Sequence, residues 1–283
     1  MTSFPANQQR RSYGWWATIP MLVLLIVPIA ALIGATTPTD IVAHIQTDVF
    51  AQAFWLSLRT SLISLALVMI LGLPLSWYLA HAPRRYARFI EPIIDLPIVL
   101  PPAVLGVALL VTFSEDGLFG SFFSSVGIHL PFSSAAVILA QMIVSAPFFI
   151  QSSNAAFKSV DPDLLLVSRT LGRSSWDTFW LVTMPLALPG IMSGAALAWA
   201  RSLGEFGATL IFAGNFPGTT QTIPLAIYVA LESDVKIALT LSVILASIAL
   251  VLLFCLRLVP VIWQRHRVPM TGVLQSHQSR RDP

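Results

Sequence analysis

The chain has 283 residues, of which 56% are hydrophobic and 10% are charged, and its mean hydropathy is +0.79. Soluble globular domains carry about 25% charged residues, so this composition excludes a soluble protein, and the high apolar content excludes a disordered one. The chain is therefore predicted to be an integral membrane protein. The isoelectric point of 9.4 comes from basic residues scattered over short loops, which indicates a membrane surface rather than nucleic acid.

Six apolar segments approach or exceed the length of about 20 residues that a transmembrane helix needs. They predict an all-α, polytopic membrane protein with six transmembrane helices. The segments cover residues 17–35, 54–80, 96–114, 133–157, 186–214 and 237–259. Residues 1–16 and 264–283 are expected to form cytoplasmic tails on either side of a transmembrane domain over 17–263. The first segment follows Arg10 and Arg11, so its removal as a signal peptide stays open as an alternative.

Basic residues are distributed unequally between the loops on the two sides of the membrane. Twelve of the sixteen Lys and Arg residues fall in alternate loops and in both tails, whereas the opposite loops hold only Lys236. Because short cytoplasmic loops are enriched in Lys and Arg, both termini are predicted to be cytoplasmic.

No catalytic or metal-binding pattern is present in the sequence. A phosphate-binding G-x-x-x-x-G-K-[ST] loop is absent, as are H-E-x-x-H and G-x-S-x-G, and the five histidines lack ligand spacing. The chain is therefore expected not to be an enzyme, and to bind neither a metal ion nor a cofactor of its own.

The segment after the fourth span, residues 158–185, is the longest loop on the basic side. Asp161 or Asp163 can cap a helix with Pro162 in its first turn, and Gly172 is a plausible stop. A second short amphipathic stretch is expected to end at Pro185. Leu164, Val167 and Leu171 recur at helical spacing before Gly172. The segment predicts two short helices, which either only lie at the membrane interface or present one helix to a cytosolic partner.

This loop resembles the cytoplasmic loop of permease subunits of ATP-binding cassette (ABC) importers. That family has the pattern E-A-A, three residues, Gly, nine residues, then I-x-L-P. Here Gly172 is followed by nine residues and then by V-T-M-P, which ends at Pro185. The E-A-A positions read L-V-S from Leu166 to Ser168, so the usual glutamate is missing. That departure leaves one polar contact with the ATPase in doubt. The resemblance implies that the loop contacts the ATPase through Leu164, Val167, Ser168, Arg169, Leu171, Gly172 and Pro185.

A second motif lies within the fifth span, where A-R-S-L-G-E-F-G-A-T is followed by G-N-F-P-G and T-I-P-L-A-I-Y. This run is similar to the oxyanion branch of these permeases, which serves molybdate, tungstate and sulfate, and it most resembles molybdate permeases. An arginine in a membrane span faces protein or water, and Arg201 and Glu205 can pair on one helix face. Gly204 and Gly207 would let another backbone approach closely. These four residues are expected to lie beside the anion path, or else only to fix helix packing.

The resemblance implies an ATP-driven importer that moves molybdate, or a related oxyanion, into the cytoplasm by alternating access. It implies a homodimer of permease subunits, two cytosolic ATPase subunits that bind ATP and Mg, and an extracytoplasmic oxyanion-binding protein. A bacterial or archaeal cytoplasmic membrane is the expected location, with lipid but no nucleic acid as a partner. Two alternatives stay open: a sulfate or tungstate permease of the same family, and an anion transporter driven by an ion gradient.

Overall fold

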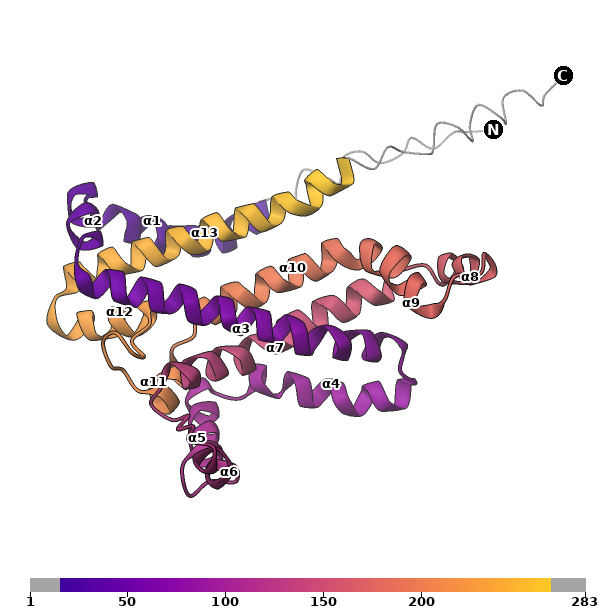
Figure 1. Ribbon diagram of the computed structural model, residues 1–283. Coiled ribbons are helices and arrows are strands. Elements are labelled where there is room, and N and C mark those ends of the chain that lie inside the picture. Colours follow the sequence, from indigo (N-terminus) through magenta and orange to yellow (C-terminus); the bar gives the residue numbers. More distant parts are fainter. Residues whose placement is uncertain (1–15, 266–283) are drawn as a thin grey trace, which may run out of the picture.

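The computed structural model describes residues 16–265, and within that range every regular element is a helix (Figure 1). A short 3-10 helix covers Trp16–Thr18, a π-helical turn (η3) covers Phe179–Thr183, and four long helical stretches form the body of the chain. The α-helices are α1 (Ile19–Gly34), α2 (Pro38–Ile45), α3 (Asp48–His81), α4 (Arg84–Val99), α5 (Pro102–Phe113), α6 (Gly120–Ser125), α7 (Ser134–Lys158), α8 (Pro162–Thr170), α9 (Ser175–Thr178), α10 (Met184–Leu203), α11 (Gly207–Ala213), α12 (Ile223–Ser233) and α13 (Val235–Arg265).

Helix α7 is the centre of the packing, and it lies along both α3 and α10. Half of its most apolar stretch is buried, a larger share than in the other long helices. Phe149 and Phe157 of α7 pack with Val68 of α3 and Ile191 of α10 in one apolar cluster. By contrast, α1 buries no residue, and its apolar side chains are left to face lipid or another chain. The fold therefore has one inner helix and a surface that is apolar over most of its length.

The prediction of six spans is confirmed when each bent pair of helices counts as one crossing. Four helices are long and apolar enough to cross a membrane, and the pairs α1 with α2 and α4 with α5 supply two more. The axes of α4 and α5 differ by 109°. The expected tails fall mostly on residues 1–15 and 266–283, which lie outside the described residues.

The bounds predicted for the third span are wrong. A single crossing was expected over 96–114, but α4 already begins at Arg84 and the chain breaks at Leu100 and Pro101. Proline lacks a backbone N–H and pushes the preceding residue out of helical conformation, and Leu100 is extended accordingly. Earlier prolines, Pro92 and Pro97, are accommodated within α4.

Both ends predicted for the fifth span are also wrong. Residues 175–203 form a continuous helical stretch, so Pro185 lies inside it and does not end a separate helix. The five residues Phe179–Thr183 before it form a π-helical turn (η3), a local departure from α-helical hydrogen bonding next to a proline that cannot donate one. At the other end, α10 stops at Leu203 instead of reaching Gly214, and α11 is a separate short helix.

The two ends of the bundle carry different elements. The start of α4, the loop with α8 and the far end of α13 lie at one end, whereas α2, α6, α11 and α12 lie toward the other (Figure 1). This grouping matches the distribution of basic residues along the sequence. The end with α8 is therefore treated as the cytoplasmic end below.

Candidate functional site

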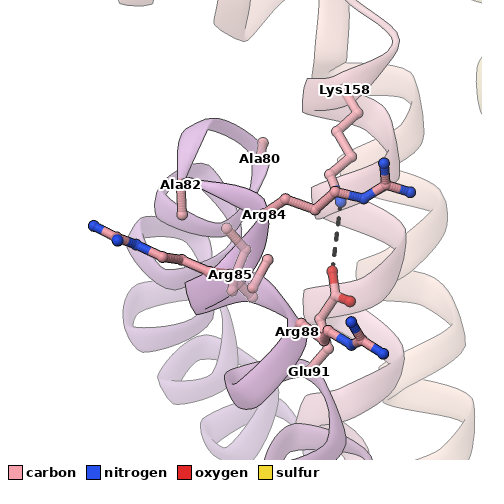
Figure 2. Close-up of a pocket in the computed structure, with 9 residues that line it drawn as sticks. Ala80, Ala82, Arg84, Arg85, Arg88, Glu91 and Lys158 are labelled. Carbon is pink, nitrogen blue, oxygen red and sulfur yellow. Dashed lines mark hydrogen bonds and ion pairs between the residues drawn. The ribbon is translucent and has the colours of Figure 1, made fainter.

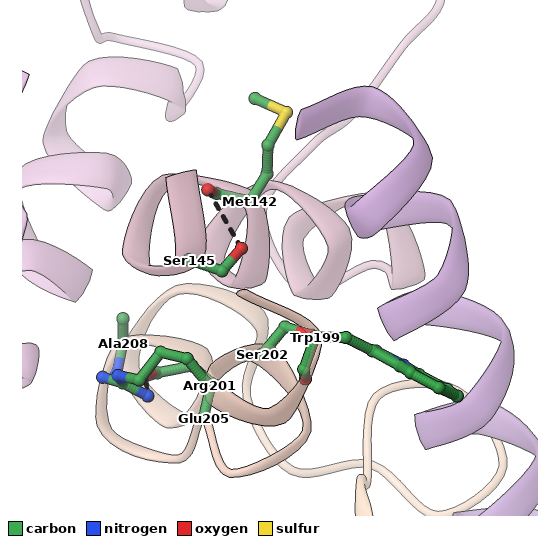
Figure 3. Close-up of polar contacts among 7 residues, drawn as sticks. All are labelled: Met142, Ser145, Trp199, Arg201, Ser202, Glu205 and Ala208. Atoms are coloured by element: carbon green, nitrogen blue, oxygen red, sulfur yellow. Dashed lines mark hydrogen bonds and ion pairs between the residues drawn. The ribbon is translucent and has the colours of Figure 1, made fainter. Parts of the chain in front are cut away.

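Arg201 and Glu205 form an ion pair where α10 ends. The distance from Arg201 Nη1 to Glu205 Oε2 is 2.9 Å. The side chain of Glu205 is 1% exposed and that of Arg201 is 30% exposed, so only the arginine has access to its surroundings. Figure 3 shows the two side chains lying against each other beside Ala208. An ion pair this short and this buried on one side fixes the position of both groups.

The sequence suggested that the two side chains pair on one face of a single helix, but α10 ends between them, at Leu203. Glu205 follows the end of α10, and its second carboxylate oxygen, Oε1, accepts a hydrogen bond of 2.9 Å from the backbone N–H of Ala208. That N–H belongs to the first turn of α11, where backbone donors have no partner within the helix. Glu205 thus connects the last turn of α10 to the first turn of α11.

The two glycines of the motif differ in their surroundings. A Cβ atom added to Gly207 would lie 2.8 Å from Cβ of Pro102, so Gly207 permits a close approach of α11 to α5. Gly204 has no such neighbour, because the nearest atoms to an added Cβ are backbone oxygens at 3.8 and 4.0 Å. Within this chain, Gly207 makes the close contact that was expected, and Gly204 does not. The break between α10 and α11 therefore lies next to the break between α4 and α5.

Two serines of α3, which the sequence reasoning missed, hold this region in place. The indole N–H of Trp199 donates to Ser61 Oγ at 3.0 Å, and the backbone N–H of Ile223 donates to Ser57 Oγ at 2.8 Å. Both hydroxyls are buried, and Ile223 begins α12. The available signal was the recurrence of serine at positions 57, 61 and 64, which places hydroxyls on one face of an apolar helix.

The predicted docking helix is α8, and its two ends are defined by specific contacts. Asp161 accepts a hydrogen bond from the backbone N–H of Asp163, so Asp161 is the cap. At the other end, Gly172 has a φ of +83°, and the N–H groups of Gly172 and Arg173 donate to the carbonyls of Arg169 and Ser168. This pair of hydrogen bonds is the Schellman arrangement, which requires a left-handed residue.

The exposed face of α8 is apolar. Leu164, Val167 and Leu171, which were expected to contact a partner, are 46%, 54% and 77% exposed. Ser168 points the other way, because it is buried and its hydroxyl lies 3.0 Å from that of Thr178 in α9. Ser168 is therefore placed to join two helices of the loop and not to touch a partner directly.

Arg169 lines a cavity of about 710 Å³ between α3 and the loop. Its other walls are aromatic and apolar, with Trp77 of α3 packed edge-on against Phe179 at a ring distance of 4.8 Å. The cytoplasmic end of α3 is thus in direct contact with the loop. In residues 16–265, no group of three His, Cys, Asp or Glu side chains is arranged to hold a metal ion.

Comparison with known proteins assigns the chain to a family. Residues 72–266 match the family described as "Binding-protein-dependent transport system inner membrane component". The chain is 41% identical over 237 residues to the "Molybdenum transport system permease protein ModB" of Mycobacterium tuberculosis, covering 83% of this chain and 90% of that protein. It is 32% identical over 249 residues to the "Probable sulfate transport system permease protein cysT" of Chlorokybus atmophyticus, covering 86% and 87%.

The fold also matches solved structures. A bacterial alginate ABC transporter, crystallised "in complex with alginate pentasaccharide-bound periplasmic protein", aligns with a TM-score of 0.67 at 18% identity and covers 85% of this chain and 92% of that one. The two chains therefore share the same overall fold. The chain belongs to the family of inner-membrane permease subunits of binding-protein-dependent ABC importers, a multi-pass subunit without catalytic activity of its own.

Proposed function

We propose that this permease carries molybdate from the extracytoplasmic side into the cytoplasm. The observation that carries the proposal is the buried Arg201–Glu205 pair within the A-R-S-L-G-E-F-G motif, together with 41% identity to a molybdenum permease over most of the chain. Identity to the sulfate permease is lower, at 32%, which favours molybdate over sulfate. Tungstate has the same shape and charge as molybdate and is expected to be carried as well.

Arg201 and Glu205 are proposed to lie beside the anion path. Glu205 is enclosed and neutralises part of the charge of Arg201, while the side chain of Arg201 is 30% exposed. In this proposal the exposed part of Arg201 faces the anion. Gly204 and Gly207 stand on either side of Glu205, at the break between α10 and α11. A helix that is interrupted at membrane depth is tolerated where it is buried in protein or lines a water-filled cavity. A path for an anion satisfies the second condition.

The α8 loop is proposed to connect this path to ATP hydrolysis. A homodimer of permease subunits would enclose the path, and two cytosolic ATPase subunits, which bind ATP and Mg, would dock on residues 158–185. Leu164, Val167, Leu171 and Arg169 would form the contact, Ser168 would hold α8 to α9, and Gly172 and Pro185 would shape the loop. Ser168 of α8 contacts Thr178, and residues 175–203 are one helical stretch, so a push on α8 would be transmitted along α10 to Arg201. An extracytoplasmic binding protein would deliver the anion.

The test is uptake by the reconstituted transporter. Permease, ATPase subunit and binding protein are placed in proteoliposomes, and uptake of molybdate, tungstate and sulfate is measured with and without ATP. We expect ATP-dependent uptake of molybdate that is competed by tungstate and weakly by sulfate. Uptake that follows an imposed ion gradient without the ATPase subunit would instead assign the chain to a gradient-driven transporter, and preferential uptake of sulfate would change the substrate.

A further inference from the structure

A basic cavity lies at the cytoplasmic end of the molecule, away from the Arg201–Glu205 pair. Its volume is about 1040 Å³, and it is bounded by the end of α3, the first turns of α4 and the end of α7. Four cationic side chains line it, namely Arg84, Arg85, Arg88 and Lys158, with Glu91 as the single carboxylate. The three arginines and Glu91 lie outside both sequence motifs, and Lys158 is the first residue of the 158–185 loop.

Two of the arginines converge on one side of α4. Arg84 and Arg88 are four residues apart and therefore share a face, and Figure 2 shows both directed to the side that carries Glu91 and faces Lys158. Arg85 points the opposite way and lies over the ring of Tyr86, with its guanidinium carbon 4.8 Å from the ring centroid. The positive-inside rule accounts for arginines at this end of the membrane, but it does not account for their convergence on one cavity.

The positive charges of this cavity exceed the negative charges that the described residues place around it. Among the described residues, neither Arg84 nor Arg88 takes part in an ion pair. Lys158 Nζ lies 3.5 Å from Glu91 Oε1, which is longer than the 2.7–2.9 Å of a strong charge-assisted bond. Three converging cations therefore face one carboxylate, and the cavity carries an excess of positive charge that a doubly negative ligand would neutralise.

The net charge of the lining side chains changes from positive to negative deeper in the membrane. A second cavity of about 330 Å³ continues along α4 and α7, and it shares Glu91 and Lys158 with the first. Its lining adds Asp95, whose carboxylate accepts a hydrogen bond from the side chain of Gln151. Carboxylates in this inner part repel an anion. An anion is thus retained in the first cavity, at the cytoplasmic end, and the two cavities together are unsuited to be a route for anions through the membrane.

We propose that Arg84, Arg88 and Lys158 form a binding site for a tetrahedral oxyanion group of the phosphate class at the cytoplasmic end of α4. Guanidinium groups match such oxygens with two parallel N–H donors, and the lysine adds a point charge. The same chemistry is offered by a free anion in the cytoplasm and by the phosphate of an anionic lipid headgroup. The site is separate from the proposed transport path, and its occupancy is a binding equilibrium that needs no ATP.

The test uses the full-length chain, freed of lipid in detergent, with inorganic phosphate as one probe and phosphatidylglycerol as the other. Phosphate binding is measured by calorimetry, and lipid binding by the chain's retention of phosphatidylglycerol from vesicles of phosphatidylcholine with and without it. The double variant Arg84→Gln, Arg88→Gln is expected to weaken binding by about tenfold for each arginine removed. The matched control for each arginine is Arg85→Gln, which removes one positive charge from the same turn but from a side chain that points away from Arg84, Arg88 and Lys158. It is expected to change binding less than about twofold.

Glu91→Gln is expected to change the binding affinity in the opposite direction. Loss of the competing carboxylate is expected to tighten binding by about threefold, since the pair with Lys158 is partly exposed and screened. Lys158→Gln serves as a second weakening variant if the double variant does not fold. If the double variant loses phosphate binding, the ligand is a free anion. If it loses lipid retention but keeps phosphate binding, the ligand is a lipid headgroup. Equal effects of Arg85→Gln and the double variant, or no binding of either probe, would overturn the site, and neither result bears on molybdate uptake.

Discussion

Gly207 lies against Pro102, and this contact brings together the first turns of α11 and α5. The neighbouring glycine Gly106 repeats the arrangement one turn further along α5, where an added Cβ would lie 2.9 Å from the carbonyl oxygen of Ala208. Each of the two helices follows a break in a membrane span. The two breaks thus form one structural unit, to which Glu205 contributes the hydrogen bond that begins α11.

Substitution of Gly207 is expected to disturb this unit. Gly207→Ala places a Cβ atom 2.8 Å from that of Pro102, a distance at which one of the two helices must shift. The expected cost is about 1–3 kcal/mol of stability, as in other overpacked sites. The measurement is the thermal unfolding midpoint of the purified chain in detergent. Gly204→Ala is the matched control and is expected to be near neutral, because its nearest neighbours lie at 3.8 Å or beyond.

The two members of the ion pair are expected to differ when they are replaced singly. Arg201→Met leaves the enclosed carboxylate of Glu205 without a counter-charge, and breaking a buried pair in this way costs about 3–5 kcal/mol. Glu205→Gln leaves Arg201 unpaired, but that side chain is 30% exposed and can be solvated, so a loss of about 1–3 kcal/mol is expected.

The double variant Arg201→Met, Glu205→Met separates packing from transport. It is expected to be more stable than Arg201→Met alone, since no unpaired charge remains. If Arg201 eases the anion along the path, this variant assembles with its ATPase and yet fails in molybdate uptake, which is the result we expect. Parental uptake by a well-folded double variant would leave the pair with a packing role only.

Gly172 is expected to be needed for coupling of ATP hydrolysis to transport. The reason is its left-handed backbone conformation, since there is room for a side chain at this position. No atom lies within 4 Å of an added Cβ, but the φ of +83° is one that β-branched residues do not adopt without strain. Gly172→Val is therefore expected to lower ATP hydrolysis that is stimulated by the loaded binding protein. Gly172→Asn, which tolerates the left-handed conformation, is expected to retain most of it. Equal activity of both variants and the parent would exclude this turn from coupling.

The exposed apolar face of α8 is expected to hold the ATPase. Leu171→Asp puts a charge on a side chain that is 77% exposed and is expected to abolish co-purification of the ATPase subunit. Leu118→Asp is the matched control, since Leu118 is 84% exposed but lies in the connection between α5 and α6, toward the opposite end of the bundle. Loss of the ATPase in both variants would indicate a general folding defect.

The orientation of the chain can be tested with reporter fusions. Enzymes that are active only outside the cytoplasm are expected to be active when fused after His129 or Ser233, and inactive when fused after Arg173. The basis is the position of twelve basic residues on the side that carries α8. An active fusion after Arg173 would reverse the orientation and remove the docking site from the cytoplasm.

Hydropathy predicted the helices that are apolar on all sides and failed for those with one polar face. The bounds of α7 and α1 differ from prediction by one or two residues. Helix α4 was missed over its first twelve residues because Arg84, Arg88, Glu91 and Asp95 lower any average taken along the chain. Their spacing of three and four residues places them on one face of a helix, which is the signal that was available.

The pairing of Arg201 with Glu205 was predictable from spacing, but the break between them was not. Four residues fit one turn of a helix, and nothing local in the sequence shows that the carboxylate would instead accept a hydrogen bond from the next helix. The close contact at Gly207 depends on Pro102, which is 105 positions earlier in the chain. Contacts of this range are set by how helices pack, which residue patterns along one segment do not encode.

The connection between α3 and α4 consists of only two residues, Ala82 and Pro83, and it bears on how the protein enters the membrane. A lone helix with the charges of α4 would insert poorly, because each charged residue at the centre of a span costs about 2.5–3.5 kcal/mol. Held to α3 by so short a link, α4 is expected to insert together with it as a helical hairpin. Lengthening the link with a flexible glycine and serine spacer would then lower the yield of membrane-inserted protein, while an equal spacer after Gly127 would not. The biogenesis of the chain would thus depend on the length of a two-residue turn.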